Sequence, residues 1–95
     1  MTGYISGSYA ASILARLGAD VIKVESPVGD GFRALGGSFQ TWNHGKRGIV
    51  IDLKVQQGKS VFHDLVKQAD VVMENYRPGV SKVLNVDYQS LTRIN

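Results

Sequence analysis

Polar side chains that could hold a small molecule follow three short apolar runs of this 95-residue chain. They are Glu25-Ser26, Asp52 to Lys54, and Glu74 to Arg77. Ligands of open parallel sheets bind outside the carboxyl ends of the strands, so the three groups would meet at one edge if the runs are strands. In the last group the ring of Tyr76 could stack on a purine, and the amide of Asn75 could hydrogen-bond a base edge or a ribose. The pattern predicts a small-molecule site at this edge.

Two glycine-rich turns are candidates for phosphate binding. Gly3-x-x-x-Gly7 precedes an apolar helical pattern and could offer backbone N–H groups to an anion. The full G-x-G-x-x-G fingerprint and a clear preceding strand are both missing, so a plain turn fits as well. Asn43 to Arg47 is a glycine turn with two cations, which could hold a phosphate or could be a solvated surface loop. Both alternatives remain open at both turns.

No catalytic residue or metal ligand is assigned from these residues. Cysteine is absent, which excludes disulfides, thiolate chemistry and cysteine-based zinc sites. His44 and His63 have no acidic or histidine partner at metal-ligand spacing. The chain also lacks a G-x-S-x-G motif and any evident Ser-His-Asp arrangement.

Composition describes a small globular domain. Hydrophobic residues make up 43% of the chain, and 11 Lys+Arg against 8 Asp+Glu give a net charge of +3. The basic residues are scattered, which argues against a nucleic-acid partner. No apolar run approaches the roughly 20 residues of a membrane span, and no secretory signal opens the chain. We therefore predict one domain over residues 1–95, with no membrane partner, in a reducing cytoplasmic setting.

Hydrophobic periodicity predicts alternating helices and strands. Helices are expected over residues 8–17, 58–69, 80–84 and 87–93, strands over 21–25, 49–53 and 71–73, and a long glycine-rich connection over 29–48. Ser6 or Ser8 could cap the first helix, Gly18 would end it, and Asp87 would cap the last. Alternation of this kind predicts an α/β fold with a mainly parallel sheet and helices on both faces.

Several of these segments together resemble the family III CoA-transferases (the CaiB/BaiF family). The resemblance begins at Gly7 to Ala11 and Leu14 to Glu25, where the family pattern is GPYA…LLADLGADVIKVE. It continues in the family's order through Gly29-Asp30, Arg33, Asn43-x-Gly45-Lys46-Arg47, Ile51 to Lys54, Ala69 to Val72, and Glu74 to Gly79. It implies CoA thioester chemistry: CoA transfer between carboxylic acids through an aspartyl intermediate, or racemisation of 2-methylacyl-CoA. It also implies a Rossmann-like large domain, a smaller domain and interlocked dimers, without a metal.

The same resemblance implies where CoA or an acyl-CoA would bind. By position, its contacts fall on side chains at the ends of the strands and in the first turn: Ser6, Ser26, Lys54, Asn75 and Tyr76. Two positions where the family has or often has a basic residue are Val83 and Ser26 here. A hydrogen bond to a charged group contributes about 1.5–3 kcal/mol, so we expect weaker CoA binding than in the family.

The resemblance also implies that parts of the family's fold lie outside these residues. The family's nucleophilic aspartate falls beyond Asn95, and its first, central strand precedes Gly3. We therefore expect a partial Rossmann-like, CoA-binding domain that is inactive alone. With the central strand missing, either Gly3 to Ser6 forms a makeshift strand or two chains pair through exposed sheet edges. The alternatives are a non-catalytic CoA- or nucleotide-binding module, an oligomeric interaction module, or an inactive gene remnant.

Overall fold

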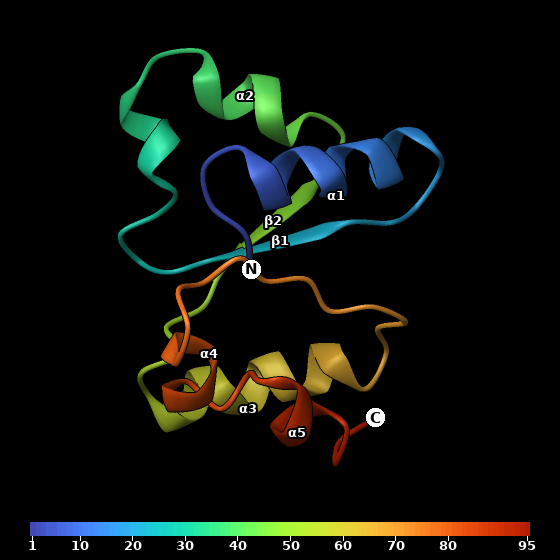
Figure 1. Ribbon diagram of the computed structural model, residues 1–95, viewed down its shortest axis with the longest axis vertical. Helices are drawn as coiled ribbons and strands as arrows, with labels where there is room; N and C mark the ends of the chain where they lie inside the picture. Colours follow the sequence, from blue (N-terminus) through green and yellow to red (C-terminus); the bar gives the residue numbers. More distant parts are fainter.

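The computed structural model describes residues 1–95 as a three-layer α/β arrangement around a two-stranded parallel sheet (Figure 1). Strand β1 is Ile22–Glu25 and strand β2 is Arg47–Val50, with Ile22 opposite Arg47 and Glu25 opposite Val50. On one face lie α1 (Ser6–Arg16), the 3₁₀ helix η1 (Gly31–Ala34) and α2 (Ser38–Asn43). On the other face lie α3 (Gln56–Val66), α4 (Val80–Val83) and α5 (Tyr88–Leu91). The predicted fold class is confirmed.

The hydrophobic core lies between the sheet and α3. Its buried members come from the first residue, the two strand regions and the C-terminal part of the chain: Met1, Val24, Ile51, Leu53, Phe62, Val66, Val86 and Leu91. Helix α3 supplies Phe62 and Val66 to this core, whereas Val61 on the same helix is 47% exposed. No helix combines the length and the apolarity needed to cross a membrane.

The face that α1 turns toward the sheet is small and polar, contrary to its apolar pattern. Its buried residues are Ser8, Ala11 and Ser12, while Ile13 and Leu14 are 41% and 40% exposed. The helix begins at Ser6, and neither serine caps it. Ser8 instead lies under the helix, with its Oγ 3.4 Å from the Lys23 ammonium. Two helix limits are as predicted. The first helix stops before Gly18, where φ is +102°. Asp87 caps the last helix by accepting a bond from Ser90 N–H.

Strand β2 begins two residues before the predicted 49–53 and ends earlier. Arg47 N–H donates to Val21 O at 2.9 Å and Ile51 N–H to Glu25 O at 2.8 Å, so pairing with β1 sets both limits. Beyond Glu25 the segment that follows β1 turns away at Pro27, so residues 52 and 53 have no strand partner. The predicted long connection over 29–48 is wrong in part, because η1, α2 and the start of β2 lie within it.

The predicted strand over 71–73 does not form, and neither does a makeshift strand at Gly3 to Ser6. Tyr4 has a φ of +55° and Ser6 already begins α1. The segment 71–76 runs beside Met1–Gly3, and the Met1 amino group donates to Met73 O at 3.0 Å (Figure 1). One main-chain bond is too few for a ladder, so the apolar residues 71–73 have no strand partner.

Gly58, in the first turn of α3, tests how closely this helix packs against the turn at Asp52 that precedes it. A Cβ at this position would collide with the carbonyl oxygen of Asp52. We expect Gly58→Ala to lower the free energy of unfolding by about 1–3 kcal/mol, because the helix must move off the preceding turn. Gly37→Ala, where a Cβ would meet nothing within 4 Å, is the matched control and should change little. Urea denaturation of both variants measures the difference; equal stabilities would contradict this packing.

Candidate functional site

Three of the five predicted contact residues line one small pocket at the carboxyl ends of the strands. Ser26 follows β1, Lys54 follows the extension of β2, and Tyr76 ends the segment that runs beside Met1–Gly3. This strand-end pocket has a volume of about 70 Å³ and is completed by Val24, Glu25, Ile51, Asp52, Leu53 and Leu84. Ser26 and Lys54 meet because parallel strands end at the same edge of a sheet, and Tyr76 is brought there by the pairing of Asn75 with Gly3.

The other two predicted residues, Ser6 and Asn75, lie together beside this pocket and do not line it. Asn75 Nδ2 donates to Gly3 O at 2.9 Å and lies 3.4 Å from Ser6 Oγ. Asn75 Oδ1 accepts from Gly3 N–H at 2.9 Å. The amide thus pairs with both main-chain groups of Gly3, as a neighbouring strand would. Asn75 holds the first turn against the segment that carries Tyr76.

Local hydrogen bonds orient Lys54 and Tyr76. Asp52 Oδ1 accepts from Lys54 N–H at 2.9 Å, a side-chain turn that leads into α3 and leaves the Lys54 side chain in solvent. Glu74 Oε2 accepts from Tyr76 N–H at 2.6 Å. Burial, and then the charge of Glu74, raises the pKa of the Tyr76 phenol. The pocket therefore presents an exposed ammonium and a neutral phenol.

Neither glycine-rich turn offers free cations to a phosphate. Lys46 Nζ donates to Ser8 O at 2.7 Å, Asn43 Oδ1 at 2.8 Å and Trp42 O at 3.0 Å. Burial, and then the charge of Lys23, lowers the pKa of Lys46 to about 8.

Arg47 forms an exposed ion pair with Asp20 at 2.6 Å. At Gly7, a Cβ would collide with Thr2, so close packing explains this glycine. The structural alternative is favoured at both turns.

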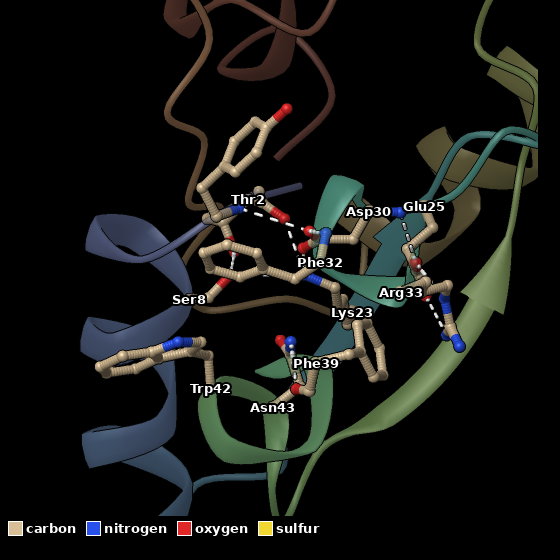
Figure 2. A network of polar contacts seen from close by, with 12 residues as sticks. Thr2, Ser8, Lys23, Glu25, Asp30, Phe32, Arg33, Phe39, Trp42 and Asn43 are labelled. Carbon is tan, nitrogen blue, oxygen red and sulfur yellow. Dashed lines mark hydrogen bonds and ion pairs between the residues drawn. The ribbon is translucent and has the colours of Figure 1, made fainter. Parts of the chain in front are cut away.

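A buried ion pair that the sequence analysis missed supports the strand ends (Figure 2). Lys23, on β1, is 4% exposed, and its Nζ lies 2.8 Å from Asp30 Oδ2. The same Nζ donates to Thr2 O at 2.8 Å. The signal was present as a single lysine inside an otherwise apolar strand, since a buried charge requires a partner.

Glu25 extends this network to the site. Its carboxylate accepts two bonds from Arg33, at 2.7 and 2.6 Å, and one from Asp30 N–H at 2.9 Å. The Arg33 guanidinium lies 3.8 Å from the centre of the Phe39 ring (Figure 2). The hydrogen bond from Arg33 lowers the pKa of Glu25, and burial only partly offsets it. The network fixes η1 beside the end of β1, next to Ser26.

The arrangement suits an anionic ligand with an aromatic ring. Lys54 forms no ion pair within 4 Å, so its charge is available to a phosphate. Tyr76, 37% exposed, offers a ring face, and Ser26 offers a hydroxyl. No three histidine, aspartate or glutamate side chains gather in a group that could hold a metal ion.

The comparisons with known proteins all indicate the same family. The model of CoA-transferase family III matches residues 1–95. The chain is 41% identical to a subunit of succinyl-CoA:(R)-benzylsuccinate CoA-transferase from Thauera aromatica, with 100% of this chain and 26% of that protein covered. It is 39% identical to formyl-CoA:oxalate CoA-transferase from Bradyrhizobium diazoefficiens, with 95% of this chain and 23% of that protein covered.

Solved structures agree with these relatives. A CaiB/BaiF family protein from Brucella suis superimposes with a TM-score of 0.95 at 37% identity, over 100% of this chain and 28% of that one. A hypothetical protein from Mycobacterium tuberculosis superimposes with a TM-score of 0.91 at 35% identity, over 98% of this chain and 27% of that one. The chain spans about a quarter of the length of these proteins.

The Lys23–Asp30 pair predicts how stability depends on pH. Burial raises the pKa of Asp30, but hydrogen bonds from Lys23 and Phe32 N–H outweigh it, and the net pKa is lowered, as it is for Glu25. A lowered pKa means that the folded state binds fewer protons than the unfolded state. The contribution of these two carboxylates to stability should therefore be full above about pH 5 and be lost as the pH drops through their folded pKa values. Urea denaturation between pH 3 and 7 measures it.

The substitution Asp30→Asn distinguishes the contribution of the Lys23–Asp30 pair from the general effect of acid on the protein. It leaves the Lys23 ammonium buried without its counter-charge and should cost about 3–5 kcal/mol at pH 7. Asp20→Asn, in the exposed pair with Arg47, is the matched control and should change stability little. A profile that is flat below pH 5, or equal costs for the two variants, would show that the buried pair has no such role.

Proposed function

Because this chain belongs to CoA-transferase family III, we propose that it is the CoA-binding portion of an enzyme that transfers CoA between carboxylic acids. The family match extends over every residue of the chain. The relatives named above are CoA-transferases that act on different acids. Transfer of CoA is the property that they share, so the proposal names CoA and leaves the acid open.

The observation that carries this proposal is the meeting of Ser26, Lys54 and Tyr76 at one pocket, from three separate segments. CoA combines phosphates with an adenine ring. We assign the Lys54 ammonium to a phosphate and the ring of Tyr76 to stacking on the adenine. The pocket of about 70 Å³ is too small for the whole ligand. Most of CoA would therefore lie along the exposed strand ends.

Ser6 and Asn75 complete the proposed binding edge. Both are exposed at the first turn, and Asn75 is bonded to Gly3 on both sides of its amide. We propose that Asn75 sets the position of this turn and that Ser6 Oγ, whose nearest side-chain partner is 3.4 Å away, is available to the ligand. These two residues define how far the ligand extends beyond Tyr76.

We propose that the 95 residues bind CoA without transferring it. A carboxylate nucleophile must be free to attack the thioester carbonyl. The three carboxylates at the strand ends are each engaged: Glu25 by Arg33, Asp52 by Lys54 N–H, and Glu74 by Tyr76 N–H. Each holds local structure, so none is assigned as the nucleophile.

Calorimetric titration of CoA into the purified chain tests the binding proposal. We expect saturable binding that weakens about tenfold or more in Lys54→Ala, since a charge-assisted bond to phosphate contributes about 1.5–3 kcal/mol. Lys67→Ala is the matched control, because it removes the same charge at the opposite end of α3 and should leave affinity unchanged. No heat at millimolar CoA, or equal weakening in both variants, would contradict the proposed site.

A homo-oligomer formed through a sheet edge is the second candidate, and the outer edge of β2 favours it. Strand β2 pairs only with β1, and three of its four residues are exposed, including Val50 at 65%. Such an edge presents unpaired main-chain groups to a second strand. A second copy of this chain could pair there by main-chain hydrogen bonds.

Light scattering on the purified chain tests this candidate. We expect the mass of a dimer, and a shift to the monomer in Val50→Lys, because a lysine on an edge strand opposes pairing. Val83→Lys, on α4 and 79% exposed, is the matched control and should remain dimeric. A monodisperse monomer of the unmodified chain would rule the candidate out.

A further inference from the structure

An exposed aromatic and apolar surface lies next to Ser6, beyond the part of the binding edge assigned to CoA. Its members are Tyr4 and Ile5 in the first turn and Phe32 in η1, on the α1 face of the sheet (Figure 1). Tyr4 and Ile5 are 62% and 48% exposed, and the hydrophobic core contains none of the three. We call these residues the first-turn surface. CoA binding, as proposed above, makes no use of them.

The ring of Tyr4 is held in position by contacts with η1. It meets the ring of Phe32 edge to face, with the centroids 5.4 Å apart and the ring planes at 79°. Gly31 makes room for it, since a Cβ at that position would collide with the Tyr4 ring and hydroxyl. The Tyr4 nitrogen lies 3.5 Å from Asp30 Oδ1. The ring therefore has a defined place although it is exposed.

The backbone of Tyr4 is strained. Its φ of +55° lies in the left-handed region, which a residue with a Cβ adopts only at a cost. The preceding residue, Gly3, is held by Asn75 on both of its main-chain groups. Strain of this kind persists where surrounding contacts maintain it, and it is concentrated at ligand-binding sites. A strained and exposed aromatic residue at the end of a binding edge indicates a ligand contact.

The proposed direction of CoA places its thioester end at this surface. A phosphate is assigned to Lys54 and the adenine to Tyr76, and Ser6 is available farther along the edge. In CoA the thioester lies at the opposite end of the molecule from the adenine. An acyl group carried beyond Ser6 would therefore meet Tyr4 and Ile5.

The first-turn surface offers no partner for a second carboxylate on the acyl group. The first turn and η1, with its capping residue, carry only two charged side chains, Asp30 and Arg33. Both are in ion pairs, with Lys23 at 2.8 Å and with Glu25 at 2.6 Å. A carboxylate brought here would lose water without gaining a cation, which is unfavourable. An apolar or aromatic group would instead pack its surface against the two rings.

We propose that the first-turn surface binds the acyl group of the CoA thioester, and that this group is aromatic or apolar and has no second carboxylate. The inference rests on the proposed function, because it takes CoA as the carrier, and it adds the class of carboxylic acid. Tyr4 contacts the acyl group, and Phe32 and Gly31 fix the place of the Tyr4 ring.

Calorimetric titration of three ligands into the 95-residue chain tests the acyl class. The ligands are CoA, phenylacetyl-CoA, and glutaryl-CoA, whose acyl group ends in a second carboxylate. We expect phenylacetyl-CoA to bind about fivefold or more tightly than CoA, because its ring packs against aromatic side chains. Glutaryl-CoA should bind no more tightly than CoA. No gain for phenylacetyl-CoA, or an equal gain for glutaryl-CoA, would overturn the proposal.

Substitutions at the Tyr4 ring test the location. In Tyr4→Ala the advantage of phenylacetyl-CoA over CoA should disappear. Tyr88→Ala is the matched control, because it removes an exposed tyrosine from α5 on the other face of the sheet, and it should keep the advantage. Gly31→Ala is the second test, since the added methyl group displaces the Tyr4 ring and should reduce the advantage.

An advantage that persists in Tyr4→Ala would contradict the assigned location. Circular dichroism shows whether this variant is folded, and Gly31→Ala decides the question by the same criterion if it is not.

The affinity for CoA itself distinguishes the two possible failures. Saturable binding of CoA with no gain from the phenylacetyl group would overturn this inference and leave the CoA site in place. An absence of binding by all three ligands would overturn the proposed function, and this inference with it.

Discussion

A buried ammonium on β1 is the constraint on which the rest of the structure depends. The Lys23 side chain is 3% exposed, and an isolated charge in such a place would not be tolerated. Its Nζ is satisfied by Asp30 from the loop before η1, by the Thr2 carbonyl and by Ser8 under α1. The first turn, the first helix and the loop after β1 therefore all contact one ammonium group. The burial of Ser8 on the sheet-facing side of α1 follows from this requirement.

The binding edge is a consequence of that arrangement. Asp30 also gives its N–H to Glu25, whose carboxylate holds Arg33, so the end of β1 is fixed beside Ser26. On the other side of β1, Thr2 is held by Lys23, and the next residue, Gly3, is held by Asn75. The position of Tyr76 follows from that of Asn75. The Lys23 network therefore connects two of the segments that bound the strand-end pocket, those of Ser26 and Tyr76, although Lys23 itself does not line the pocket.

Local patterns were sufficient for the features that depend on local physics. The helix stop at Gly18 and the Asp87 cap are set within a few residues, and the sequence predicted both. The limits of β2 and the state of residues 71–73 were mispredicted, because a strand exists only where a neighbour pairs with it. Val71-Val72-Met73 has the composition of a strand and lacks the partner.

The same distinction between predictable and unpredictable features holds for the candidate site. Sheet topology brought Ser26 and Lys54 together, because parallel strands end at one edge, and the family resemblance supplied the ligand and the place of Tyr76. Partners of individual polar groups were not predictable, since they depend on tertiary distances. Lys46 was a candidate phosphate ligand by sequence, and three oxygens of its surroundings already engage it. Asn75 was a candidate ligand contact, and both ends of its amide hold Gly3.

The binding edge also depends on one short element, Met1–Gly3. Met1 is bonded to Met73, and Gly3 pairs with Asn75, the residue before Tyr76. These contacts restrain the segment that carries Tyr76. Ordering that segment before a ligand arrives removes part of the entropy that the ligand would otherwise have to offset. The first turn therefore contributes to binding by fixing Tyr76 as well as by presenting Ser6.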